Sequence, residues 1–501
     1  MTDTLSPTEI KKRSIKGAKW LLVMNGMGMP AAFLIVFMLG RVGPAALGVY
    51  ALAQILIGVI TTFVVYGGTP VLSVFMPKLS DAEDRGRFLF SYALILLVMM
   101  TVALGLFWLF PKGFEFLMQR EFDMRNYAWF LLLAIVIVMS ETLANTASGL
   151  MLIKTAAIAH QMMRLVLLPL VAVLFFFKRE ILVDHGLPCI LGGFLAGYIL
   201  AVVICVIGIA RDQRFKMQPG WLLPRGFWAF SLSAMMATVF TFLYSNFDRM
   251  AVLSINNVEG LGMYQAVLSL SMLIRLVPKM LGTTLVPMFS SLLATGKTDA
   301  VRKAYDVIQR TGSILMTGAA LFLISYSGEL LALFGESYSS YDYLLALFCV
   351  QTVITSLHFG NTPILIAYEK NLFRLGVSTF QIIIQIALTL IFITSFGVMA
   401  IASAKVIGVI FANALNIFYV INRISDDFKI PHSYKVGVAS ALICAIVRIY
   451  FLPDEWLTST AVFLFFSGCF FIGSKITIEE INGIIDLVFS RKFSSKQKIG
   501  Y

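Results

Sequence analysis

Apolar runs of about 18 residues or more recur along the whole chain, and each is long enough to cross the hydrocarbon core of a bilayer as a helix. Hydrophobic residues make up 59% of the sequence and charged residues 13%, which lies outside the range of soluble globular proteins. We therefore predict an all-α polytopic membrane protein with about 14 transmembrane helices. Their approximate cores are residues 18–40, 46–76, 88–110, 127–152, 157–177, 187–210, 227–253, 262–294, 311–334, 341–367, 372–395, 397–421, 434–452 and 456–474.

Lysine and arginine are distributed unevenly between the two sides of these spans. Of the 39 basic residues, 27 fall in the two termini and the loops on their side, 7 fall in the opposite loops and 5 lie within spans. The positive-inside rule then places both termini in the cytoplasm. The first apolar run lacks a small-residue cleavage pattern, so we interpret it as a retained span and not as a signal peptide. Orientation explains most of the net charge of +12, so no nucleic-acid partner is needed.

Three of the prolines that lie within spans, Pro30, Pro70 and Pro278, predict bends or broken backbone. No connection between spans is long enough to form a folded extramembrane domain. The sequence contains no Walker A, HExxH or GxSxG pattern, and its five cysteines are scattered without metal-ligand spacing. We therefore expect a function within the bilayer that is not enzymatic and needs no cofactor or metal.

A short motif repeats after six spans. Leu47–Ala53 (LGVYALA) opens span two and Leu261–Val267 (LGMYQAV) opens span eight, and the preceding spans end at Arg41 and Arg249. Such a repeat indicates two six-helix bundles in parallel orientation, with the site between them. The predicted divisions are an N-terminal lobe at 1–215, a C-terminal lobe at 216–430, two extra helices at 431–476 and a cytoplasmic amphipathic tail at 477–501.

Five short motifs follow one another along the chain: Gly40–Pro44, Leu47–Tyr50, Asp248–Arg249, Leu261–Tyr264 and Phe396–Ala400. Their order over fourteen spans resembles the multidrug/oligosaccharidyl-lipid/polysaccharide exporter superfamily, and specifically its branch of O-antigen and exopolysaccharide flippases. The resemblance implies a bacterial inner-membrane transporter that moves an undecaprenyl-pyrophosphate-linked glycan to the outer leaflet for lipopolysaccharide or other cell-surface polysaccharide biosynthesis. We expect a monomer that meets the lipid-linked oligosaccharide, membrane lipids, and the glycan polymerase and chain-length machinery.

Seven ionisable residues lie within the predicted spans, and their formal charges sum to +3. Charge at this depth is costly and indicates either a function or a specific partner. A cavity with this balance suits an anion such as the pyrophosphate of a lipid-linked sugar, which the planar forks of arginine bind well. The seven residues are Glu141, Arg164, Asp248, Arg249, Arg275, Lys279 and Lys405.

Arg275 is the first candidate for substrate binding, ahead of a structural pairing between helices. It lies about 20 Å into span eight, too deep to reach either surface readily. Lys279, one turn further, fits substrate contact and the cytoplasmic interface about equally. Arg249 suits an outer gate as well as a substrate site. Arg164 and Lys405 are further candidates, although both lie nearer to the ends of their spans.

Two carboxylates are candidates for coupling to a proton or sodium gradient. Glu141 lies near the middle of span four, where it either binds the coupling ion or is the fixed partner of an arginine. Asp248 lies near the outer end of span seven beside Arg249, and a gate, a structural pair and a substrate site all fit that position.

The leading hypothesis is a flippase that works by alternating access. A lipid II flippase stays open as an alternative, because it also needs a basic cavity. A multidrug or cation antiporter of the same superfamily is expected to have twelve spans and a cavity dominated by carboxylates. A membrane glycan polymerase or ligase is expected to carry a large outer loop with catalytic residues, whereas the outer loops here are short.

Overall fold

The computed structural model describes residues 7–476 apart from short gaps. Three features of the sequence therefore lie outside the described residues, namely Pro278, Lys279 and the predicted tail at 477–501. The gaps are residues 66–67, 80, 110–111, 113–114, 116–123, 185, 213–214, 276–284, 286–287, 291, 294–295, 297, 425–427 and 452–454.

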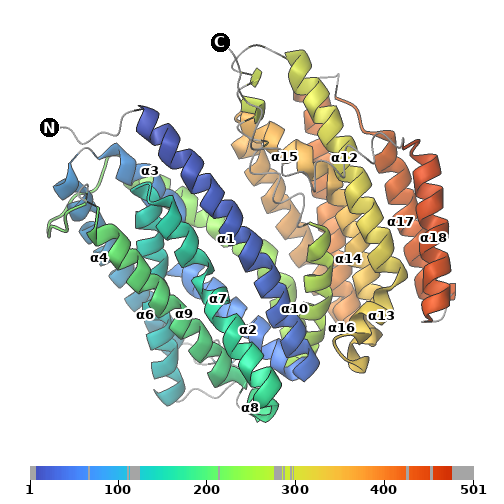
Figure 1. The fold of residues 1–501 in the computed structure, drawn as a ribbon, viewed down its shortest axis with the longest axis horizontal. Coiled ribbons are helices and arrows are strands. Elements are labelled where there is room, and N and C mark those ends of the chain that lie inside the picture. Colours follow the sequence, from blue (N-terminus) through green and yellow to red (C-terminus); the bar gives the residue numbers. More distant parts are fainter. Residues whose placement is uncertain are drawn as a thin grey trace. The chain divides into compact units, whose positions relative to one another are not determined.

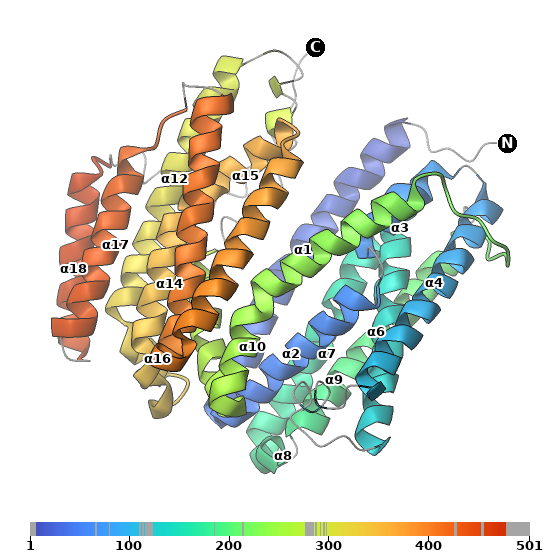
Figure 2. The same ribbon diagram turned by 180° about the vertical axis from the view of Figure 1, so that it is seen from behind.

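Every element in this described part of the chain is a helix, as predicted (Figure 1, Figure 2). The α-helices are α1 (Pro7–Val42), α2 (Pro44–Phe63), α3 (Gly68–Phe75), α4 (Ala82–Leu109), α6 (Met124–Gly149), α7 (Ile153–Phe177), α8 (Arg179–Asp184), α9 (Gly186–Ala210), α10 (Phe227–Ile274), α12 (Thr298–Ser325), α13 (Ser327–Ala332), α14 (Asp342–Ile354), α15 (His358–Ala367), α16 (Asn371–Tyr419), α17 (His432–Phe451) and α18 (Trp456–Gly473). Short 3₁₀ segments occur at η1 (Met76–Lys78), η2 (Glu336–Tyr341) and η3 (Thr355–Leu357), and a π-helical turn, η4, at Val420–Ile424.

Twelve helices in the described residues are long and apolar enough to span a membrane. Two of them, α10 and α16, are about twice the usual length and contain non-helical backbone, at Asn256–Asn257 and at Gly397. Helix α16 therefore holds two of the predicted spans, and α10 holds one span and the first part of the next, so the count agrees with about fourteen. Near the other predicted breaks, α2 ends at Phe63 ahead of Pro70, whereas α1 continues through Pro30 without interruption.

The break in α10 is stabilised by a local cap. Asn257 has a φ of 57°, in the left-handed region that asparagine tolerates better than most residues. Its side-chain oxygen accepts hydrogen bonds from the backbone N–H groups of Glu259, at 3.0 Å, and Gly260, at 3.2 Å. These bonds satisfy donors that a helix start leaves open. The second half of α10 therefore begins as a separate helix that carries the repeated LGMY motif.

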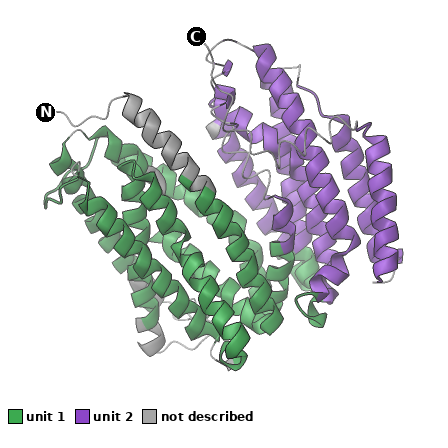
Figure 3. Ribbon diagram, viewed as in Figure 1, with its two compact units in different colours: residues 1–269, 333–338, 390–401 green, residues 270–332, 339–389, 402–501 purple. Residues whose placement is uncertain are grey.

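The chain forms two compact units, shown separately in green and purple in Figure 3. Unit 1 contains residues 1–269, 333–338 and 390–401, and unit 2 contains residues 270–332, 339–389 and 402–501. In unit 1, small residues allow helices to approach closely, since Ala144, Ala156 and Ala201 share one buried cluster of α6, α7 and α9. The lobe boundaries drawn from the sequence stay a prediction.

Inside unit 1, the glycines of the two repeated motifs contact each other's helices reciprocally. A Cβ atom on Gly48 would lie 1.8 Å from the carbonyl oxygen of Val258, and one on Gly262 would lie 1.9 Å from that of Pro44. Each carbonyl belongs to the residue four positions before the other glycine. Such mutual contacts are expected where two similar segments meet about a two-fold axis. The repeat is therefore visible in the packing as well as in the sequence.

Unit 2 contains a buried polar clamp that joins its last two helices to the α12–α13 turn. Arg448, on α17 and 2% exposed, places Nη2 at 3.3 Å from a carboxylate oxygen of Glu329, and its Nε donates to the carbonyl of Ser325 at 3.0 Å. Ser459, on α18, donates a hydrogen bond to the other oxygen of Glu329. The predicted spans thirteen and fourteen are thus fixed to the body of unit 2.

Candidate functional site

Two arginines from different helices interact electrostatically with one buried tyrosine in the interior of unit 1. Arg164 comes from α7 and Arg249 from the first half of α10, and both interact electrostatically with Tyr50, which is 1% exposed. Tyr50 also hydrogen-bonds with the side chain of Gln54 one turn along α2 and stacks on Phe194 of α9, with ring centroids 5.9 Å apart. The structure therefore brings together two basic candidates that the sequence placed in separate spans.

Asp248 and Arg249 have different surroundings although they are neighbours in sequence. Asp248 is fully buried and accepts a hydrogen bond from the hydroxyl of Tyr264 at 2.7 Å. Because Tyr264 follows the break in α10, this bond joins the two halves of the helix. Arg249 places Nη1 at 3.5 Å from the side-chain oxygen of Asn246, and its Nε has no hydrogen-bond partner among the described residues. The guanidinium keeps donor capacity that a ligand could use.

Glu141, the first coupling candidate, lies next to a histidine. Its Oε2 is 4.0 Å from Nδ1 of His160 on α7, and the two side chains are 25% and 34% exposed. On the following turn, Arg164 donates from Nη1 to Gln161 at 3.1 Å, and Gln161 donates to Asn25 of α1 at 3.0 Å. In the described part of the chain, the neighbour of Glu141 at this distance is therefore His160 and not an arginine.

Arg275 belongs to unit 2, directly after the end of α10. Its Nε and Nη2 lie 3.4 and 3.3 Å from the hydroxyl oxygen of Thr352 on α14, and that hydroxyl donates to the carbonyl of Phe348 at 2.8 Å. Among the described residues, no carboxylate lies within ion-pair distance of Arg275. Lys405, on the second half of α16, also belongs to unit 2 and is 9% exposed. Unit 2 therefore contains two of the predicted basic residues.

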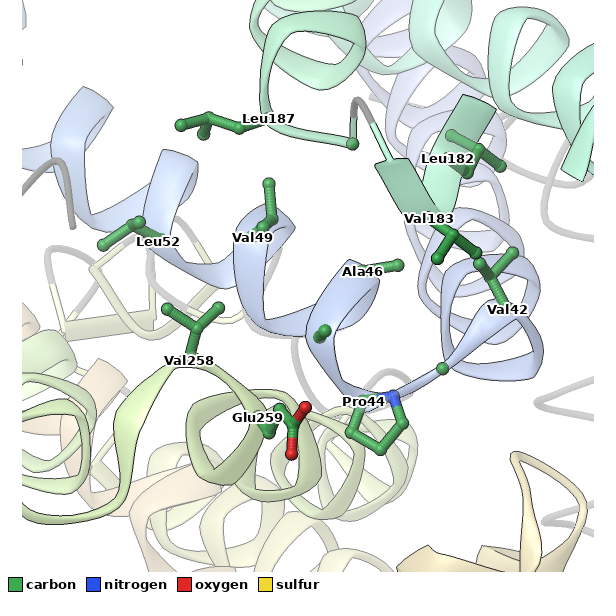
Figure 4. Close-up of a pocket in the computed structure, with 13 residues that line it drawn as sticks. Val42, Pro44, Ala46, Val49, Leu52, Leu182, Val183, Leu187, Val258 and Glu259 are labelled. Atoms are coloured by element: carbon green, nitrogen blue, oxygen red, sulfur yellow. The ribbon is translucent and has the colours of Figure 1, made fainter. Parts of the chain in front are cut away.

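A cavity of about 320 Å³ lies in unit 1 beside the reciprocal glycine contact. Figure 4 shows its mostly apolar lining, with Pro44 and Val49 of α2 near Val258 and Glu259 of α10. The Glu259 carboxylate is the charged group of this lining. A carboxylate repels phosphate, so the arrangement does not suit a pyrophosphate and we do not assign the anion site to it.

Sequence reasoning missed the partners of several charges. His160 lies four residues before Arg164 in an apolar run, and this spacing could have indicated a shared helix face. Arg448 and Glu329 are not among the seven intramembrane charges that the sequence predicts, and Arg448 lies near the end of its apolar run. Both are buried, and they form the clamp in unit 2.

Comparison with known proteins agrees with this fold. Residues 14–293, more than half of the chain, match the sequence profile of the family described as "Polysaccharide biosynthesis protein". The chain belongs to this family. A curated relative, "Probable low-salt glycan biosynthesis flippase Agl15" of Haloferax volcanii, is 20% identical over 445 residues, which cover 88% of this chain and 89% of the relative. The match to this relative extends through both units.

Solved structures show the same fold at low sequence identity. An inward-facing multidrug resistance transporter of the MATE family and the MOP superfamily has a TM-score of 0.64 at 12% identity, covering 82% of this chain and 98% of that one. The lipid II flippase MurJ in an inward closed conformation has a TM-score of 0.57 at 14% identity, covering 91% and 99%. This member of the polysaccharide biosynthesis protein family therefore has a MATE- and MurJ-like fold, and the similar proteins are transporters.

Proposed function

We propose that this protein is a flippase that carries an undecaprenyl-pyrophosphate-linked oligosaccharide across the bacterial cytoplasmic membrane by alternating access, with both termini in the cytoplasm. Family membership and the glycan flippase relative support a lipid-linked glycan as the cargo. The biased distribution of lysine and arginine supports the orientation. A role in supplying O-antigen or exopolysaccharide, next to a glycan polymerase, is part of the same proposal, as is a monomeric state.

The contacts of Arg275 are the observation that carries this proposal. A partly buried guanidinium is costly unless it is paired, and here a threonine hydroxyl occupies two of its donors while no described carboxylate neutralises it. The positive charge of the Arg275 guanidinium and its remaining N–H groups suit two oxygens of a phosphate group. Lys405 and the undescribed Lys279 are proposed to add charge. In unit 1, Arg164 and Arg249 beside Tyr50 provide a second set of donors.

Transport by variants of Arg275 tests the proposal. We expect Arg275→Ala to slow flipping of a fluorescent undecaprenyl-pyrophosphate oligosaccharide in proteoliposomes about 10- to 150-fold, because a hydrogen bond to a charged group is worth about 1.5–3 kcal/mol. Arg275→Lys keeps the charge without the planar fork and is expected to retain intermediate activity. Thr352→Val, which removes the hydroxyl that positions the guanidinium, is expected to cause a smaller loss than Arg275→Ala.

The control is Arg423→Ala, which removes an exposed arginine of unit 2 and should leave transport unchanged. Equal flux in the wild type, Arg275→Ala and Arg275→Lys would falsify the assignment of Arg275. If lipid II is carried as fast as the oligosaccharide in the same vesicles, the cargo assignment is wrong and the lipid II alternative replaces it.

A further inference from the structure

Glu141 and His160 form a pair whose charge depends on bound protons. Their side chains approach to 4.0 Å from α6 and α7, and both are partly accessible. A carboxylate paired with arginine would keep a fixed charge, because arginine does not lose its proton in proteins. A carboxylate paired with histidine can instead hold no proton, one or two over the pair, since imidazole titrates near neutral pH. The geometry therefore supplies a site that exchanges protons.

The titratable groups near Glu141 come from the helices that pack against α6. From α9, Tyr198 and Cys205 face Glu141, and from α7, Arg164 follows His160. Tyr50 of α2 faces Arg164, and α3 carries no titratable residue. The charged residues of α4 lie in its first turns and have partners there. Helix α4 also carries the buried Tyr92. The ammonium group of Lys78, in η1, lies over the ring of Phe75. These α4 and loop contacts are Glu83–Lys216, Asp84–Arg87 and Arg85–Leu79.

The pair lies one helical turn from a proposed anion-binding residue. Residues four apart on a helix are neighbours on one face, with Cβ atoms about 5–6 Å apart, so His160 and Arg164 share a face of α7. With Glu141 ionised and His160 neutral, the charges of Glu141 and Asp248 balance those of Arg164 and Arg249. The first proton on the pair makes this group of residues net positive, and the second adds another charge.

We propose that the Glu141–His160 pair is a proton-binding site whose protonation turns the group formed with Arg164, Asp248 and Arg249 from neutral to cationic and strengthens binding of an anionic pyrophosphate head at Arg164. The identity of the anion rests on the proposed function. Linkage requires the converse as well, so binding of the anion draws protons onto the pair. The coupling between proton binding and anion binding is positive. Each ligand strengthens binding of the other, because each makes the local charge more favourable for the other.

Proton uptake on ligand binding tests this linkage. The full-length protein in detergent is titrated calorimetrically with farnesyl pyrophosphate at pH 5.5, 7 and 8.5, in buffers of different ionisation enthalpy. We expect the affinity of the wild type to fall about 5- to 150-fold from the lowest to the highest pH, after correction for ionisation of the probe, with net proton uptake per anion bound. Glu141→Gln removes the negative charge permanently, so its affinity should stay high at pH 8.5 and its excess uptake should disappear.

His160→Gln is expected to bind weakly with a flattened pH dependence, whereas the control His432→Gln, which removes an exposed imidazole from unit 2, should match the wild type. Ionisation of the probe is common to all variants, so the differences between variants decide. Identical affinity profiles and proton uptake in the wild type and Glu141→Gln overturn the proposal while leaving anion binding intact. A response to sodium in place of protons overturns it in the same way. Absence of anion binding by the wild type at every pH refutes the proposed function itself.

Discussion

Replacing Arg448 by methionine is expected to cost about 3–5 kcal/mol of unfolding free energy, because it leaves the Glu329 carboxylate buried without its cation. The same substitution removes the donor to the Ser325 carbonyl at the end of α12. Of the clamp contacts described above, only the hydrogen bond from Ser459 to the Glu329 carboxylate then remains. SDS-induced unfolding in mixed micelles, followed by tryptophan fluorescence, measures the loss.

A double variant separates the value of the pair from the cost of an unpaired charge. Glu329→Leu combined with Arg448→Met replaces both ions by apolar groups, and such replacements of buried pairs are often close to neutral. We expect the double variant to be more stable than Arg448→Met alone. The matched control is Arg423→Met, an exposed site where the change should stay within about 0.5 kcal/mol. If Arg448→Met is no less stable than Arg423→Met, the clamp does not hold α17 and α18 in place.

The helical spans could be predicted from the sequence because the bilayer imposes a length and a composition that local runs of residues reveal directly. The two breaks inside long helices were also predictable in position. Gly397 stood between two apolar runs, and its φ of 54° is one that glycine adopts without a Cβ penalty. Asn257 lay in the polar stretch between spans seven and eight, where a side-chain cap was needed. These features depend on neighbours in sequence.

The partners of the buried charges could not be predicted, since they depend on which helix faces meet. Glu141 could be recognised as a deep carboxylate, but its neighbour His160 follows 19 residues later on another helix. Arg448 and Glu329 are 119 residues apart, and each is near a helix end, where a charge is ordinarily solvated. Residue type and depth identify candidates, whereas pairing requires the packing of the bundle.

The reciprocal glycine contact leads to a second large expected effect. In both Gly48→Ala and Gly262→Ala, the new Cβ would lie less than 2 Å from a backbone carbonyl oxygen, and the backbone cannot rotate away as a flexible side chain can. The start of α2 and the second half of α10 must therefore separate. Overpacking of this kind costs about 1–3 kcal/mol. We expect both variants to unfold more readily than Gly192→Ala, a matched helical control with no neighbouring heavy atom within 4 Å.

The contact also predicts how the two substitutions combine. If Gly48 and Gly262 occupy equivalent positions about one two-fold axis, each substitution alone separates the same two segments and the losses should be similar in size. The double variant should then lose less than the sum, because the first separation already makes room for the second Cβ. A cysteine at Val49, which lines the adjoining cavity (Figure 4), should react faster with a maleimide in either variant once the natural cysteines are replaced. Strictly additive losses with unchanged labelling would mean that the two glycines pack independently, and the repeat would then be a feature of sequence without a shared interface.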